Sequence, residues 1–156
     1  MKKLVTLCML LAVVLSAAGC GKQDAPKSFS VDCIRTLVDA GAFSEELEVL
    51  EGDIPFALYA LADYSLTLKD LKECAAVRSA GATCEEAAVL IFEEDSQAAT
   101  AKTALEDYLA AQIESNESYR PQEIPKLESA VVEVRGNTLL FAVPADPDAV
   151  NEILAQ

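Results

Sequence analysis

The chain has 156 residues, of which 12 are Lys or Arg and 26 are Asp or Glu, so its formal charge at pH 7 is −14. Such an acidic surface repels phosphate backbones and anionic headgroups, which argues against nucleic-acid binding. The sequence contains no histidine, which removes His-based catalytic triads and imidazole metal sites.

The first 19 residues have the order of parts of a secretory signal. Lys2 and Lys3 precede an apolar stretch over residues 4–18, and small residues lead into Cys20. The apolar run is about 15 residues, whereas a helix that crosses hydrocarbon needs about 20, so a permanent membrane span is disfavoured. We therefore predict that residues 1–19 are a lipoprotein signal peptide.

The small residues before Cys20 resemble the lipobox of bacterial lipoproteins, in which the cysteine thiol receives a diacylglycerol and the cysteine becomes the new N-terminus. Ala17 departs from that pattern, which prefers Leu, Val or Ile, and an ordinary signal cleaved after Ala18 or Gly19 is the alternative. Each buried CH₂ group of an acyl chain contributes about 0.8 kcal/mol to membrane binding, so two chains, such as palmitate, form a stable anchor. We expect lipid on Cys20 to hold the protein on the outer face of the cytoplasmic membrane.

Residues 20–29 are polar and contain Gly and Pro, which predicts a lipid-anchored tether, and residues 30–156 are predicted to form a single domain. Ser30 is a candidate cap for a short helix that ends near Gly41. The apolar face of this helix is expected to contain Ile34, Leu37 and Val38. A second short helix is predicted over residues 53–61, while helix and strand stay undecided for the segment between the two.

Four apolar segments rich in β-formers predict two antiparallel hairpins. Residues 74–78 and 87–92 flank a Gly-containing turn, and residues 130–134 and 138–143 flank a tight turn at Gly136.

Between the hairpins, apolar residues recur at helical spacing, which predicts a long helix that ends at residues 116–119. Asp95 or Ser96 is expected to cap its start. Asp146 followed by Pro147 predicts a final short helix. The expected fold is α+β: a four-stranded antiparallel sheet built from two hairpins with a long helix between them, and helices packed on one face.

Cysteine spacing predicts free thiols rather than a disulfide. If the first hairpin reverses between Gly81 and Ala82, Cys74 lies opposite Val89 and several residues out of register with Cys84, too far for a bond. With Cys33, three thiols stay after lipidation of Cys20, and their spacing matches no paired-cysteine zinc site.

The order of several short motifs resembles the lipoprotein family of clostridial type known as domain of unknown function 4358. The motifs are Ser79-Ala80-Gly81-Ala82-Thr83 with Glu85-Glu86, Ser118-Tyr119 with Pro121 and Glu123, Lys126-Leu127-Glu128, Ala130-Val131-Val132 and Gly136-Asn137. The resemblance covers residues 31–154, with departures at Cys84 and Ser129. It implies an architecture and a Gram-positive origin, and no activity.

We find no residue set that predicts catalysis, a metal or a cofactor. The six glycines are scattered, so no phosphate-binding loop is present. Paired carboxylates acting on cell-wall glycan are an alternative, although such clefts usually carry aromatic sugar platforms and this chain has no Trp. A cleft with two carboxylates about 5–10 Å apart favours that enzyme, whereas a shallow apolar patch favours a binding module.

Tyr119, Arg120 and Lys126 form the most site-like group, because an aromatic ring and two cations gather where the long helix gives way to a connector. A purely structural role is the alternative: Tyr119 packs over the helix end, and Lys126 pairs with Glu123 or Glu128. We predict a membrane-anchored, non-enzymatic binding or interaction module for an unknown protein or envelope partner.

Overall fold

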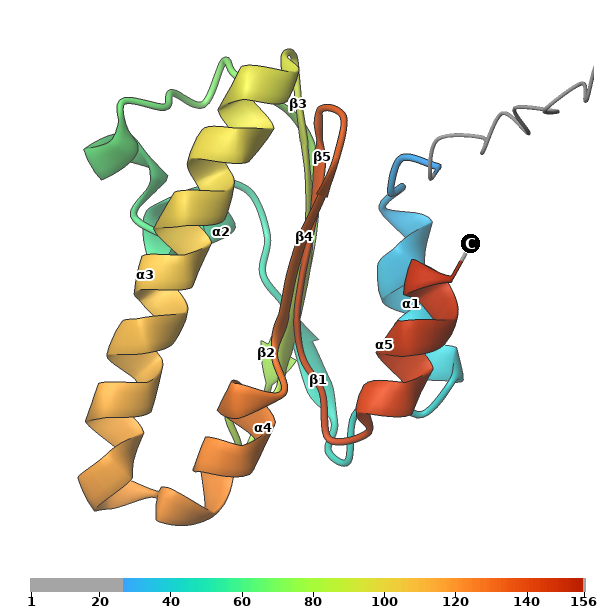
Figure 1. Ribbon diagram of the computed structural model, residues 1–156, viewed down its shortest axis with the longest axis vertical. Helices are drawn as coiled ribbons and strands as arrows, with labels where there is room; N and C mark the ends of the chain where they lie inside the picture. The colour runs from blue at the N-terminus through green and yellow to red at the C-terminus, as the bar shows by residue number, and fades with distance from the viewer. Residues whose placement is uncertain (1–26, 156) are drawn as a thin grey trace, which may run out of the picture.

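The computed structural model describes residues 27–155, so the predicted signal peptide, Cys20 and most of the tether lie outside the described residues. Helices and strands are interspersed along the chain (Figure 1). The elements are α1 (Asp32–Asp39), β1 (Leu47–Val49), α2 (Ile54–Leu58), the 3-10 helix η1 (Leu61–Tyr64), β2 (Leu71–Ser79), β3 (Glu86–Phe92), α3 (Asp95–Tyr119), the 3-10 helix η2 (Pro121–Glu123), α4 (Ile124–Glu128), β4 (Val131–Arg135), β5 (Thr138–Val143) and α5 (Pro147–Leu154).

The sheet has five antiparallel strands in the order β1-β2-β3-β5-β4, so the prediction of four strands is wrong. The two predicted hairpins are present as β2–β3 and β4–β5. The additional strand, β1, lies in the segment that the sequence left undecided, and it pairs with β2 from Leu47 opposite Ser79 to Val49 opposite Val77. Three residues are too few for an alternating pattern to identify a strand before its partner is known.

Helices cover both faces of the sheet, not one as predicted (Figure 1). α3, α4, α2 and η1 lie on one side, whereas α1 and α5 lie on the other. On β3, Ala88 and Leu90 belong to the core beneath α3, while Ala87 and Val89 belong to the core beneath α1 and α5. A strand that is buried on both faces carries a continuous apolar run, which is the pattern of residues 87–92.

The first hairpin is shifted by one residue from the predicted register. Cys74 lies opposite Leu90 rather than Val89. The backbone N–H of Ser79 donates to the carbonyl of Glu85 at 2.8 Å, so the connecting loop is centred on Ala82. The second hairpin turns tightly, with Arg135 opposite Thr138 and a positive φ at Gly136.

The long helix α3 confirms the prediction from its apolar spacing, but its cap is one residue earlier than expected. Glu94 and Gln97 form a capping box, in which each side chain accepts a bond from the other residue's backbone N–H. The final helix also agrees with its prediction, since the Asp146 side chain accepts from the backbone N–H of Asp148 at 3.0 Å. Within residues 27–155, no helix is long and apolar enough to cross a membrane.

The two N-terminal helices differ in detail from their predictions. α1 has no side-chain cap from Ser30, and Val38 is 48% exposed instead of buried. The helix predicted over residues 53–61 ends at Leu58, because Ala60 adopts a left-handed conformation (φ +50°) that starts a separate 3-10 turn. Left-handed φ is costly for residues with a Cβ, so tertiary packing must hold this break.

Candidate functional site

The loop between β2 and β3 is attached to the corner where α3 passes into α4. Arg120, which directly follows α3, donates from Nη1 to the carbonyl oxygen of Ala82 at 2.7 Å and from Nε to the Asn116 side chain at 2.8 Å. The Glu123 carboxylate accepts from the backbone N–H of Cys84 at 2.9 Å. These bonds connect the loop to the corner across about forty residues of sequence. We call this region the corner cluster, and it also contains Glu85 and Lys126.

An ion pair between a buried carboxylate and a partly exposed lysine lies at the centre of the corner cluster. The Glu85 carboxylate accepts from Lys126 Nζ at 2.8 Å, from the Ser44 backbone N–H at 2.7 Å and from the Ser44 hydroxyl. Lys126 also lies 3.4 Å from Glu123. Burial raises the pKa of Glu85, but the bonds from Lys126 and Ser44 outweigh burial and leave it below its ordinary value. Burial likewise lowers the pKa of Lys126, and its two carboxylate partners more than reverse that effect.

Glu86, the next residue, is buried beneath α3 and is bound by two tyrosines. Its carboxylate accepts from the Tyr59 hydroxyl at 2.6 Å and from the Tyr108 hydroxyl at 3.0 Å. Burial raises the pKa of Glu86 above its ordinary value, although both tyrosine bonds and the nearby Arg78 oppose the shift. The pKa of each tyrosine is raised as well, first by burial and then by the neighbouring carboxylate.

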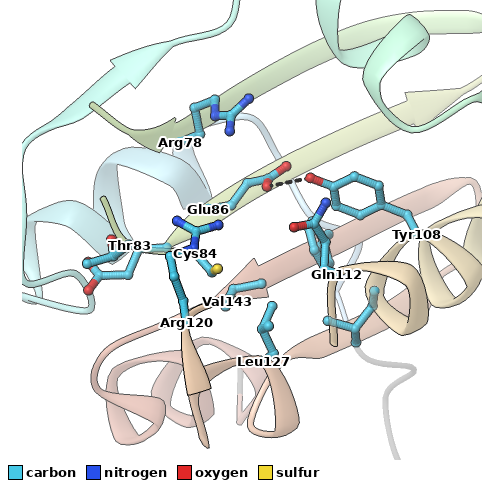
Figure 2. A pocket seen from close by; sticks show the side chains of 12 residues that line it. Arg78, Thr83, Cys84, Glu86, Tyr108, Gln112, Arg120, Leu127 and Val143 are labelled. Atoms are coloured by element: carbon cyan, nitrogen blue, oxygen red, sulfur yellow. Dashed lines mark hydrogen bonds between the residues drawn. The ribbon is translucent and has the colours of Figure 1, made fainter. Parts of the chain in front are cut away.

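A small cavity lies beside Glu86, between the start of β3 and α3. Figure 2 shows Glu86 and Tyr108 at one end and Arg120 with Cys84 at the other. The volume is about 30 Å³, which holds one or two water molecules and excludes a sugar ring. A hollow of this size lies between packed side chains and accommodates molecules of the size of water.

The structure brings two of the three predicted site residues together. Arg120 and Lys126 both belong to the corner cluster, where each binds other parts of the chain. The sequence offered Glu123 as one partner of Lys126, and the structure contains that pair, but Glu85 is the closer partner. Tyr119 is 85% exposed, so it does not pack over the helix end.

Sequence reasoning missed Glu85, Glu86, Ser44 and Tyr59 as members of these networks. The available signal was the pair of carboxylates where the apolar strand β3 begins, because a polar group that is buried there is expected to have a hydrogen-bond partner. Their partners lie at least 22 residues away in sequence, which no local pattern reveals.

The cysteines and acidic side chains of residues 27–155 are the remaining groups with possible chemical roles. The thiols of Cys33, Cys74 and Cys84 are free. Burial raises the pKa of Cys74 to about 11, which disfavours the nucleophilic thiolate. Residues 27–155 contain no group of three or more Cys, Asp or Glu side chains arranged to hold a metal ion.

Comparison with known proteins identifies a family. The family model for a domain of unknown function, DUF4358, matches residues 61–144, more than half of the chain, and the protein belongs to this family. No curated protein and no solved structure matches the chain significantly. The matched region includes β2 to β5, and the motifs around Glu85 and Lys126 that carry the resemblance meet in the corner cluster.

Proposed function

We propose that the protein is a lipoprotein, anchored through lipid on Cys20 to the outer face of the cytoplasmic membrane, whose domain is a non-enzymatic binding or interaction module. The support for the anchor is the sequence: a basic start, an apolar run too short to span a membrane, and small residues before Cys20. The polar tether over residues 20–29 keeps the domain near that membrane.

One observation favours a binding module over an enzyme: the charged side chains of the corner cluster are already bonded to other groups of the protein. Glu85, Glu86 and Glu123 each accept bonds from protein donors, and the adjoining cavity has a volume of only about 30 Å³. A carboxylate glycosidase needs an acid and a base or nucleophile on either side of a bound sugar. The alternative, a wall-glycan enzyme, therefore has less support at this site than a binding module has.

We propose that the surface around Tyr119, at the end of α3, is the contact surface for a protein partner in the envelope. Tyr119 is 85% exposed at the last residue of α3, and the bonds of Arg120 and Lys126 fix the backbone that follows it. An exposed tyrosine on a rigid element buries a large area with little entropic cost, which is why tyrosine is common at interface hot spots.

The anchor is tested by Cys20→Ala in cells fed a clickable fatty acid. We expect the parent protein to carry the label and to sediment with membranes, and the variant to lose the label and to accumulate as uncut precursor or in the medium. Cys33→Ala is the control and should label like the parent. A Cys20→Ala protein that still labels contradicts the anchor.

The contact surface is tested by placing a photo-crosslinking phenylalanine analogue at Tyr119 or, as control, at Val38, which is 48% exposed on α1 across the sheet. We expect a discrete crosslinked product from position 119 in intact cells and none from position 38. The same products from both positions contradict the surface. Release of soluble glycan from purified walls by the protein supports the enzyme instead.

A further inference from the structure

A larger hollow lies on the same side of the sheet as α3, between η1 and the middle of that helix. Its volume is about 400 Å³ and it is wide open to solvent, so a small molecule bound there stays partly exposed. We call it the tyrosine groove. Its lining consists of Tyr59, Ala60, Asp63, Tyr64, Ala104, Asp107 and Tyr108.

The tyrosine groove offers acceptors and aromatic rings but almost no free donors. Among the lining residues within 27–155, the donor side chains are three tyrosine hydroxyls, and each is already bonded: Tyr59 and Tyr108 donate to Glu86, and Tyr64 donates to Asp107. No Lys, Arg or amide side chain of the described part of the chain lines the groove. The two aspartates therefore disfavour an anionic ligand and favour one that carries positive charge.

The aromatic rings of the tyrosine groove are held in place from behind. The rings of Tyr59 and Tyr108 pack edge to face, with centroids 5.3 Å apart, and each also packs against Phe141. Both hydroxyls bind the buried Glu86 carboxylate, which adds a polar attachment to the packing. Tyr59 is itself fully buried, so it supports the partly buried ring of Tyr108 from behind, and the rings that a ligand can reach are those of Tyr64 and Tyr108. The Tyr108 ring is thus oriented before any ligand arrives, which lowers the entropic cost of binding.

We propose that the tyrosine groove binds a small organic ammonium ion, whose charge lies between the Asp63 and Asp107 carboxylates and whose carbon groups pack on the rings of Tyr64 and Tyr108. Aromatic rings combined with carboxylates are the usual receptor for alkylammonium groups. A bare Ca²⁺ is a poorer fit, since it needs six to eight oxygen ligands. This inference rests on the proposal that the domain is a binding module.

Calorimetry on the full-length protein in non-ionic detergent tests the charge requirement. The probes are choline, its neutral isostere 3,3-dimethylbutan-1-ol and n-butylammonium. We expect at least one ammonium probe to bind and the neutral isostere to show no saturable heat. Comparison of choline with butylammonium distinguishes a quaternary from a primary ammonium ligand. The proposal is overturned if neither ammonium probe binds at millimolar concentration, or if the neutral isostere binds equally well.

Matched variants test the position of the site. Asp63→Asn and Asp107→Asn should each weaken binding about fivefold, as expected for the loss of one solvent-screened charge contact near 4 Å. Asp39→Asn removes the same charge from an exposed position on α1, across the sheet, and should leave binding unchanged. Tyr64→Ala should weaken binding, whereas Tyr64→Phe, which keeps the ring, should not.

Equal effects of Asp39→Asn and Asp107→Asn, or displacement of the probe by Ca²⁺, contradict the proposal. The outcome is separable from that of the proposed function. A groove that binds no ammonium, in a protein that labels at Cys20 and crosslinks from position 119, overturns this inference alone.

Discussion

The ion pair between the buried Glu85 and the partly exposed Lys126 offers the most direct test of how much the corner cluster contributes to stability. The Glu85 side chain is fully buried, whereas the Lys126 side chain is 23% exposed, and their charged atoms lie 2.8 Å apart. Lys126→Met keeps most of the apolar stem and removes the ammonium. The variant therefore leaves a buried carboxylate with Ser44 as its remaining partner.

The expected loss of stability follows from burial and from the partners that stay. Removing one member of a fully buried pair costs about 3–5 kcal/mol. The two Ser44 bonds persist and the lysine is partly exposed, so we expect about 2 kcal/mol for Lys126→Met. Lys102→Met is the control, because Lys102 and Glu106 form an exposed pair 3.8 Å apart. That control should lose less than about 0.5 kcal/mol.

The loss should depend on pH in a defined direction. The pKa of Glu85 lies below its ordinary value of 4.5 in the folded protein, so its contribution to stability is present above pH 4.5 and disappears as pH falls through the folded pKa. The difference between the parent and Lys126→Met should therefore be largest near neutral pH and shrink in acid. Urea unfolding followed by circular dichroism measures both. A loss at pH 7 no larger than that of Lys102→Met refutes the reasoning.

Three further predictions concern the core and the thiols. Burial raises the pKa of Glu86, so ionisation of this carboxyl destabilises the folded protein as pH rises through that pKa. The free energy of unfolding of Glu86→Gln, relative to that of the parent, should therefore increase from pH 4.5 to pH 7.5 in urea melts. A difference that stays constant with pH contradicts this. Leu37 and Leu105 lie in the cores on opposite faces of the sheet, and replacing either with Ala should lower the free energy of unfolding by about 3 kcal/mol in the same melts. A negligible loss for Leu37→Ala contradicts a core on both faces. In native protein at pH 8, Cys74 should react with an alkylating agent more slowly than Cys84, because the pKa of Cys74 is about 11 and its thiol is the more deeply buried. Mass spectrometry of peptides measures both rates. Faster alkylation of Cys74 contradicts its burial.

Local sequence signals were sufficient for the order of most elements. Apolar residues at helical spacing identified α3, and proline after Asp146 identified α5. The two hairpins followed from apolar runs around turns, including the one at Gly136. These predictions succeed because period, capping and turn chemistry act within a few residues of chain.

The candidate site was only partly predictable. The sequence singled out Arg120 and Lys126 by their place after a long helix, and suggested Glu123 as a partner of Lys126 within one helical turn. The closer partner, Glu85, lies 41 residues earlier, and nothing local indicates that a loop between two strands reaches α4.

What the sequence determined by itself is therefore the charge, the absence of histidine and the succession of most helices and strands, while the export signal stays a prediction. Tertiary structure decided the pairing of β1 with β2, the placing of helices on both faces of the sheet and the meeting of Glu86 with two tyrosines. The tyrosine groove belongs to the second group, since η1 and α3 line it together. Such features depend on contacts between distant segments, whose free energy is gained only when the whole sheet and its two helical layers pack together.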